Sequence, residues 1–172
     1  MEQKGYIHVY TGNGKGKTTA AFGLAVRALC AGYSVYVGQF VKSMKYNETK
    51  LTELFPKLQI EQLGSGCYIN RKPSLEDINQ AKVALKHCTE ILRNGMYDVV
   101  ILDELNIALH FGLVELEEVL QTLKQRPSHV EVVITGRYAP KELIEVADLV
   151  TEMQEIKHYY QAGVLSRNGI DR

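Results

Sequence analysis

The sequence predicts a three-layer α/β domain, in which helices cover both faces of a mainly parallel central sheet. Segments with strand composition alternate with segments of helical spacing along most of the chain, as in parallel sheets with crossover helices. A glycine-rich segment follows the first predicted strand, and Val99 to Leu102 has the composition of a strand buried on both faces. At 172 residues, we expect one domain, 1–172, without an internal repeat or a linker.

The glycine-rich segment is close to a phosphate-binding loop (P-loop) and begins where the apolar strand Tyr6 to Tyr10 ends; it reads Thr11-Gly-Asn-Gly-Lys-Gly-Lys-Thr-Thr19. Gly16-Lys17-Thr18 has the spacing of the motif, but Thr11 stands where its first glycine is expected. Glycines let backbone N–H groups turn toward phosphate oxygens, and the next helix adds its positive dipole end. The segment indicates nucleoside triphosphate binding, with Lys17 on phosphate oxygens and the Thr18 hydroxyl on Mg²⁺. The alternative is a turn that only joins a strand to a helix.

The elements after the loop, in the first half of the chain, each have their own signal. Lys17 to Ala31 is rich in Ala and Leu, lacks proline and is followed by glycine, which predicts a helix. Three valines in Ser34 to Val41 stand an even number of positions apart, so in a strand their side chains would share one face. A polar loop then begins at Lys42, and ligands gather at such strand ends. Glu48 to Phe55 predicts a short helix, and Leu58 to Leu63 predicts a strand.

A long amphipathic helix is expected next. Ser74 and Asp77 form a capping-box signature, and apolar residues recur at helical spacing until Asn94 and a glycine end the run. Cys88 lies on the apolar stripe, so we expect it to pack in the core and not to serve redox or metal chemistry.

The second half continues the alternation of strands and helices. After the buried strand, helical patterns occupy Leu105 to Phe111 and Leu116 to Lys124, and a proline then breaks the chain before the strand Val130 to Thr135. Pro140 opens a helix that runs to Ala147, and Leu149 to Glu155 is the last expected strand. Strands and a P-loop in this order place the expected fold in the P-loop NTPase-like (RecA-like) class.

Paired carboxylates, Asp103 and Glu104, end the buried strand and are similar to the Walker-B element of P-loop enzymes. One carboxylate, the Thr18 hydroxyl and phosphate oxygens suffice for Mg²⁺, which keeps several waters. The alternative is a pair of solvated acids at the start of the next helix, where its dipole favours them. We also expect this strand to neighbour the P-loop strand.

Composition excludes several classes of function. Twenty Lys and Arg balance twenty Asp and Glu, so net charge indicates neither nucleic acid nor an anionic membrane as partner. Three cysteines without paired spacing argue against a disulfide scaffold or a zinc site. No apolar stretch has the length of a membrane span, no export signal is present, and we expect a cytoplasmic protein. Without a catalytic triad or a kinase catalytic loop, the motifs alone indicate a Mg²⁺-nucleoside triphosphate enzyme whose transferred group is unknown.

The chain closely resembles the P-loop type of ATP:corrinoid adenosyltransferases over nearly its whole length. The resemblance begins with the P-loop itself, in which Thr11 belongs to that family's pattern. An ordered set of further landmarks makes it specific: Gln39-Phe-Val-Lys42, Gly64-Ser-Gly66, Val100-Ile-Leu-Asp-Glu-Leu105, Ile134-Thr-Gly-Arg137, Ala147-Asp148, Lys157-His158 and Gly169-Ile-Asp171.

This resemblance implies that the Co(I) of a reduced corrinoid attacks the 5′ carbon of ATP and expels triphosphate. The nucleophile is then the metal of the substrate, so the protein need only position the substrates and stabilise charge on the leaving group. It also implies that ATP lies across the P-loop in the reverse of the usual sense. The expected catalytic residues are Lys17, Thr18 and Glu104, with Thr18 and Glu104 on Mg²⁺ and Asp103 as the less certain carboxylate. The expected nucleotide contacts are Gly12, Asn13, Gly14, Lys15, Gly16, Lys17, Thr18, Thr19, Arg27 and Arg137, although either arginine has an equal alternative as a structural ion pair.

On the corrinoid side, relatives place aromatic residues after the Gly64-Ser-Gly66 turn that help to remove the lower cobalt ligand. Here Cys67 and Ile69 take those positions, so Tyr68 is the candidate, with local packing as the equal alternative. His158 is expected to shape the edge of the site and not to bind cobalt. A flavoprotein reductant and a homodimer are implied by the resemblance alone.

Two other functions stay open beside adenosyl transfer. The first is an ATPase or small-molecule kinase that cleaves the γ-phosphate, and the more distant one is a nucleotide sensor without turnover. The sequence does not distinguish complete cobalamin, cobinamide or an a,c-diamide precursor as the preferred corrinoid.

Overall fold

The computed structural model describes residues 4–42, 46–64 and 72–171, and its six strands form one parallel sheet. The sheet order is β3-β2-β4-β5-β1-β6, and every neighbouring pair is parallel. The strands are β1 (Ile7–Thr11), β2 (Val35–Gln39), β3 (Leu58–Gln62), β4 (Val99–Asp103), β5 (Glu131–Thr135) and β6 (Leu149–Glu152). The predicted α/β fold with a parallel sheet is confirmed.

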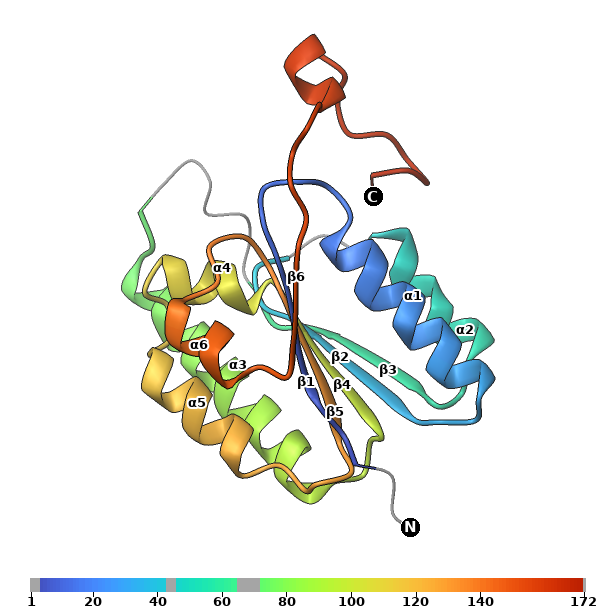
Figure 1. Cartoon of the computed structure of the whole chain (residues 1–172), viewed down its shortest axis with the longest axis vertical. Helices are drawn as coiled ribbons and strands as arrows, with labels where there is room; N and C mark the ends of the chain where they lie inside the picture. The colour runs from blue at the N-terminus through green and yellow to red at the C-terminus, as the bar shows by residue number, and fades with distance from the viewer. Residues whose placement is uncertain (1–3, 43–45, 65–71, 172) are drawn as a thin grey trace.

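Helices cover both faces of this sheet, which confirms the three layers (Figure 1). One face carries α1 (Lys17–Cys30) and α2 (Leu51–Leu54); the other carries α3 (Leu75–Asn94), α4 (Leu105–His110), α5 (Leu116–Lys124) and α6 (Lys141–Val146). Each face has its own buried apolar cluster, and the α1 cluster is built on small residues such as Ala21 and Ala25, which let the helix approach the strands closely.

Most element boundaries lie within a few residues of those predicted from local sequence signals. Ser74 and Asp77 form a complete capping box at the start of α3, with the Ser74 side chain accepting from the Asp77 N–H. Cys88 is fully buried, and burial raises the pKa of its thiol to about 12, as expected of a core residue. The expected helix at 48–55 begins instead as a 3-10 turn, Asn47–Lys50, before α2.

The expected pairing of the P-loop strand with the strand that ends in Asp103 is wrong. β5 lies between them, because Ile134 pairs with Leu102 of β4 on one side and with Val9 of β1 on the other. Lateral strand order depends on how the crossover helices pack, which the strand sequences do not encode. The P-loop still reaches the end of β4 because α1 packs across β4 and β5.

All six strands end at the same edge of the sheet, and the loops that follow them lie together there. The P-loop and the C-terminal segment (residues 153–171) both lie at this edge in Figure 1. The segment contains a 3-10 turn, Tyr159–Ala162, that the sequence patterns did not predict. Within the described residues, no helix is long and apolar enough to cross a membrane.

Candidate active site

The P-loop takes its shape by packing closely on the chain that leaves β6. Gly14 N–H donates to Met153 O at 2.6 Å, and a Cβ at Gly12 or Gly14 would lie 2.4 or 2.7 Å from that same oxygen. Gly12 and Gly16 have φ of 92° and 122°, which side-chain-bearing residues rarely adopt. β6 ends at Glu152, earlier than expected, and its next residues support the loop.

Thr11 is explained by its place in β1. It is the last residue of that strand, pairs with Glu152 of β6, and has none of the positive φ that would call for glycine. Its hydroxyl accepts a hydrogen bond from Ala139 N–H at 3.3 Å. Threonine therefore joins the P-loop to the loop after β5, a role that glycine cannot perform.

Lys17 lies under the P-loop and holds a buried positive charge there. Its ammonium donates to Gly12 O at 2.8 Å and to Gly14 O at 2.6 Å, and only 9% of the residue is exposed. Burial lowers the pKa of Lys17, with Glu104 opposing this shift and Arg137 adding to it. The ammonium is thus available to phosphate oxygens at the centre of the loop.

Asp103 is the centre of a buried polar cluster, the Asp103 cluster, which consists of Thr18, Gln39, Lys42, Asp103 and Thr135. Its Oδ1 accepts from Thr18 Oγ1 at 2.8 Å and Thr135 Oγ1 at 2.7 Å; its Oδ2 accepts from Gln39 Nε2 at 3.1 Å and Lys42 Nζ at 3.0 Å. Burial lowers the pKa of Lys42, but attraction to Asp103 outweighs it, and the net pKa is raised. Asp103 is fully buried, which contradicts the alternative of a solvated acid.

Glu104 is the second carboxylate, and its side chain lines the cavity. Its φ of 61° is left-handed, a strained conformation for a residue other than glycine and one that clusters at functional sites. The backbone N–H donates to Thr135 Oγ1 at 3.0 Å, which fixes this conformation. Burial and, secondly, Asp103 raise the pKa of Glu104, while Lys42, Lys17 and Arg137 oppose the rise.

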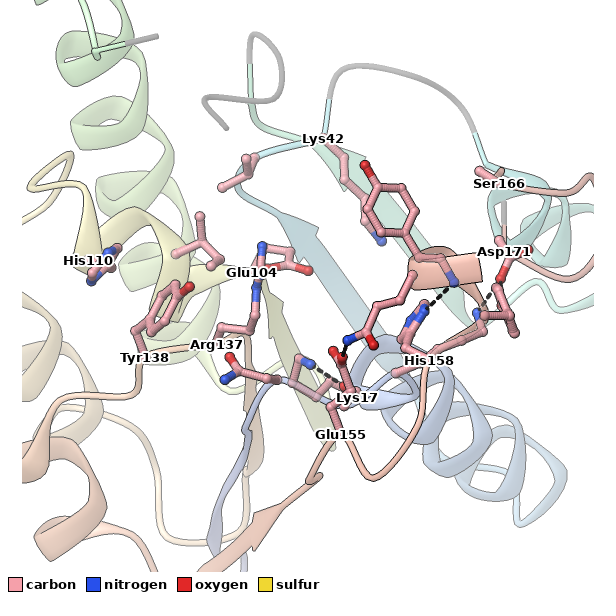
Figure 2. Close-up of a pocket in the computed structure, with 18 of the residues that line it drawn as sticks. Lys17, Lys42, Glu104, His110, Arg137, Tyr138, Glu155, His158, Ser166 and Asp171 are labelled. Atoms are coloured by element: carbon pink, nitrogen blue, oxygen red, sulfur yellow. Dashed lines mark hydrogen bonds and ion pairs between the residues drawn. The ribbon is translucent and has the colours of Figure 1, made fainter. Parts of the chain in front are cut away.

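Two adjoining cavities meet at these groups. The larger has a volume of about 1030 Å³ and the smaller about 440 Å³; they share Lys15, Lys17, Lys42, Tyr46, Glu104 and Asp171. Arg137 and an aromatic pair line the larger one, in which the His110 and Tyr138 rings stack with centroids 4.2 Å apart. Thr18, Thr19 and Phe22 line the smaller one. Figure 2 shows Glu104 and Arg137 on one side of the larger cavity and His158 and Asp171 on the other.

The C-terminal segment forms the second wall of the larger cavity. Asp171 pairs with Lys15 of the P-loop at 2.8 Å and with Arg167 Nε at 3.1 Å, and it also accepts from the Tyr159 hydroxyl. Lys15 lowers the pKa of the Asp171 carboxyl most, with Tyr159 next. His158 lies at the cavity edge, as expected, and its Nδ1 accepts from Tyr160 N–H at 3.1 Å, which caps the 3-10 turn.

Comparison with known proteins identifies the architecture and the family. Residues 3–171 match the family model described as ATP:corrinoid adenosyltransferase BtuR/CobO/CobP. The chain belongs to this family. Among its relatives, the corrinoid adenosyltransferases of Pseudomonas aeruginosa and of Escherichia coli K12 are each 38% identical over 99% of this chain, covering 85% and 87% of their own lengths. That of Salmonella typhimurium is also 38% identical, with 99% and 87% covered.

A solved structure supports the fold alone. The flagellar accessory protein FlaH from Methanocaldococcus jannaschii superposes with a TM-score of 0.55 at 15% identity, covering 87% of this chain and 71% of that one. The P-loop NTPase-like class predicted for this adenosyltransferase-family chain is confirmed.

Most of the expected site residues of this family member come together, but Arg27 does not. Arg27 lies exposed in the last turn of α1, about 15 Å along the helix from Lys17, and is not among the described residues that line either cavity. Arg137 does line the larger cavity. Tyr68 lies outside the described residues, as do Cys67 and Ile69.

Three functional features were not found from the sequence. Gln39, Lys42 and Thr135 were noted only as strand-end or family landmarks, and their convergence on Asp103 depends on lateral strand order. The pairing of Lys15 with Asp171 joins residues 156 positions apart, and no local pattern signals it. The stacked His110 and Tyr138 come from the end of α4 and from the loop after β5. The glycine before Arg137, which allows an unusual backbone conformation, was the available sequence signal.

The oxygen atoms that meet near the end of β4 are suitable ligands for Mg²⁺. The Thr18 hydroxyl and the Glu104 carboxylate are hard oxygen ligands at the smaller cavity, and Mg²⁺ needs few protein ligands when phosphates complete its shell. Gln39 Oε1, on the side chain that donates to Asp103, is a further buried oxygen without a partner in the described structure. Within the described residues, no group of three or more His, Cys, Asp or Glu is placed to hold a metal.

Proposed function

We propose that this chain transfers the 5′-deoxyadenosyl group of ATP to the Co(I) centre of a reduced corrinoid and releases triphosphate. The observation that carries the proposal is the family match over residues 3–171, whose P-loop adjoins a cavity of about 1030 Å³. A kinase or ATPase is not favoured, because no comparison or contact points to γ-phosphate transfer.

In the proposed step, the cobalt electron pair forms a bond to C5′ of ATP as the C5′–O bond breaks. The electron pair of that bond leaves with the triphosphate, and cobalt rises formally from Co(I) to Co(III). No side chain is needed as a nucleophile, which agrees with a site of phosphate and metal ligands and no catalytic triad. The protein contributes position and electrostatic stabilisation of the leaving group.

The two cavities favour the reversed pose of ATP that the family implies. A corrin macrocycle and adenosine require the larger cavity, on the Arg137 and Tyr138 side, while Thr18 and Thr19 face the smaller one. C5′ must meet cobalt in the larger cavity. The triphosphate then extends from C5′ into the smaller cavity, with its terminal phosphates toward Thr19. Lys17, which lines both cavities, then lies beside the bond that breaks.

Mg²⁺, when bound, would neutralise charge on the triphosphate oxygens. We assign Thr18 and Glu104 as its protein ligands, as expected from the sequence. Asp103 is better suited to holding the Thr18 hydroxyl, because all its hydrogen bonds go to protein donors. Lys17 and Arg137 would bind the phosphates directly.

Further parts of the proposal rest on family resemblance or on the sequence. A homodimer and a flavoprotein reductant follow from the resemblance, whereas a single domain over 1–172 and a cytoplasmic location follow from chain length and composition. Tyr68 remains the candidate for displacing the lower cobalt ligand, and unchanged activity of Tyr68→Ala on cob(II)alamin plus reductant would count against it. Arg27 has no comparable support from its position.

The test is product analysis with ATP, Mg²⁺ and chemically reduced cobalamin. We expect a light-sensitive cobalt–carbon product, seen by its absorbance change, that forms only when enzyme and ATP are both present. Omitting the enzyme is the control for non-enzymatic alkylation of Co(I) by ATP. Formation of ADP without the cobalt–carbon product would exclude the proposed function and support a kinase or ATPase.

A further inference from the structure

The carboxylate of Asp103 has no free capacity for another ligand. A carboxylate offers about four lone-pair positions, and four donors, two on each oxygen, already occupy them. Two of these donors are hydroxyls and one is an amide, so none of the three balances the negative charge. An unbalanced charge at a fully buried position is strongly unfavourable.

Lys42 is the cation that balances this charge. Among the described residues, it is the cationic side chain that donates to Asp103, at 3.0 Å. The two other nearby cations point elsewhere: Lys17 donates to the carbonyls of the P-loop, and Arg137 lies over the Tyr138 ring at 5.6 Å. Lys42 follows β2, so the charge on β4 is balanced from the neighbouring strand.

Lys42 is itself held in place by two further groups. Glu48 lies 3.5 Å from its ammonium, the Tyr46 ring centroid lies 5.0 Å away, and only 14% of the side chain is exposed. The Lys42 ammonium is thus paired with two carboxylates, whereas the Lys17 ammonium donates to two backbone carbonyls. The geometry of Lys42 is that of a support for Asp103.

We propose that Lys42 is a positioning residue for the metal–nucleotide complex. By balancing the charge of Asp103, it keeps that carboxylate on its protein donors, with the Thr18 hydroxyl held and Glu104 left as the carboxylate that faces the nucleotide. The inference rests on the proposed function for the identity of the ligand, Mg²⁺-ATP. It adds a residue whose effect on binding passes through Asp103 and not through contact with phosphate.

Loss of Lys42 should therefore disturb metal-dependent binding most. Without it, the charge of Asp103 has no cationic partner, and Asp103 competes with Glu104 for the metal while releasing Thr18. Supporting residues of this kind change metal affinity by about 10–100-fold when removed. Binding of ATP in the absence of metal depends on Lys17 and the loop amides, so it should change less.

The experiment measures ATP binding by calorimetry, with and without Mg²⁺ and without any corrinoid. In Lys42→Met we expect Mg²⁺-ATP binding to weaken about 10–100-fold, with metal-free ATP binding within about threefold of the parent, and in Lys42→Arg we expect most of the loss to be restored. Lys141→Met, which changes an exposed lysine with 87% of its side chain accessible, is the matched control and should bind normally. A folded Lys42→Met that binds Mg²⁺-ATP like the parent overturns the proposal.

A double-mutant cycle separates positioning from direct phosphate contact. In an Asp103→Asn background the charge that Lys42 balances is gone, so adding Lys42→Met should weaken Mg²⁺-ATP binding by less than about threefold. A further loss as large as that of Lys42→Met alone would mean that Lys42 binds phosphate itself, and the proposal would be wrong. This comparison also serves if Lys42→Met alone does not fold, because removing both charges leaves no unpaired ion.

The outcome is independent of whether adenosyl transfer occurs. Absence of a cobalt–carbon product would reject the proposed function while the binding cycle could still support Lys42 as a positioning residue. Normal product formation would support the proposed function, and additive effects of the two substitutions in the cycle would at the same time reject Lys42 as a positioning residue.

Discussion

The Asp103 cluster and the C-terminal segment line the same site but are held in different ways. Asp103, Gln39 and Thr135 are fully buried at the ends of three adjacent strands. Residues 160–170 are all exposed, and the segment meets the P-loop chiefly through Asp171 and Lys15 at its end and through Met153 at its start. The part that serves triphosphate and metal is thus continuous with the core, whereas the opposite wall rests on a few polar contacts.

This difference suggests a division of work. Charge stabilisation requires donors fixed in advance, because reorganisation during the reaction would remove the benefit. A wall that meets a large macrocycle needs room to adjust, and weakly supported segments are the ones that open locally. Changes in the cluster should therefore affect global stability, and changes in the segment should affect local order but not global stability.

The largest effect is expected from Lys17→Ala at the P-loop. Removing a charge directed at the leaving group should lower kcat/KM by about 100-fold or more, because the loop amides alone cannot neutralise triphosphate. The measurement is the initial rate of cobalt–carbon bond formation. A rate equal to that of the parent would remove the P-loop from the mechanism.

Thr135→Val should be the next largest change and should act on stability. It deletes the donor to Asp103 and the acceptor for Glu104 N–H at a fully buried position. Leaving buried polar groups without partners should lower the free energy of unfolding by about 1–3 kcal/mol, measured in urea. Thr52→Val is the control, since Thr52 is exposed and bonds only Thr49 O; equal effects of the two changes would contradict the contrast between the regions.

Asp171→Asn should loosen the C-terminal segment without unfolding the protein. The change weakens its pairing with Lys15 and Arg167, whose side chains are 39% and 48% exposed, and ion pairs with exposed partners add little to global stability. Hydrogen exchange should become faster in the segment near residues 159–171, while the thermal unfolding midpoint stays within error of the parent. A large fall of that midpoint would show that the segment is part of the cooperative core.

The smallest effect is the response of this contact to pH. The Lys15 ammonium, with Tyr159 and Arg167, holds the pKa of Asp171 below its ordinary value. The contribution of this carboxylate to order in the segment is therefore fully present above an ordinary aspartate pKa of about 3.9 and is lost only as pH falls through the lower folded-state value. Exchange rates in the segment should be constant from neutral pH to about pH 5 after correction for intrinsic exchange. Loosening already at pH 6 would exclude control by Asp171.

Much of the fold followed from local patterns, and parts of the site did not. Helix and strand boundaries depend on caps, periodicity and glycines, so Ser74, Gly95 and the run before Asp103 were sufficient to place them. Which strands are neighbours depends on helix packing, and the expected pairing of β4 with β1 failed for that reason. For the same reason the Asp103 cluster was not predicted, because its members come from three strands, the loop after one of them and one helix.

The P-loop shows both the value and the limit of a motif. The residues of the motif indicated phosphate binding and, through family resemblance, a particular reaction. They did not show why Thr11 replaces glycine, because the reason is a contact with Ala139 N–H 128 residues away in the chain. Departures from a motif are thus explained by neighbours in space and not in sequence.

The most direct test of the account is the phosphorus spectrum of one reaction that contains the enzyme, ATP, Mg²⁺ and chemically reduced cobalamin. We predict that inorganic triphosphate appears in step with the cobalt–carbon product and that ADP stays at the level of an enzyme-free control. Release of ADP and phosphate, with no triphosphate, would contradict the claim that this P-loop holds triphosphate as a leaving group.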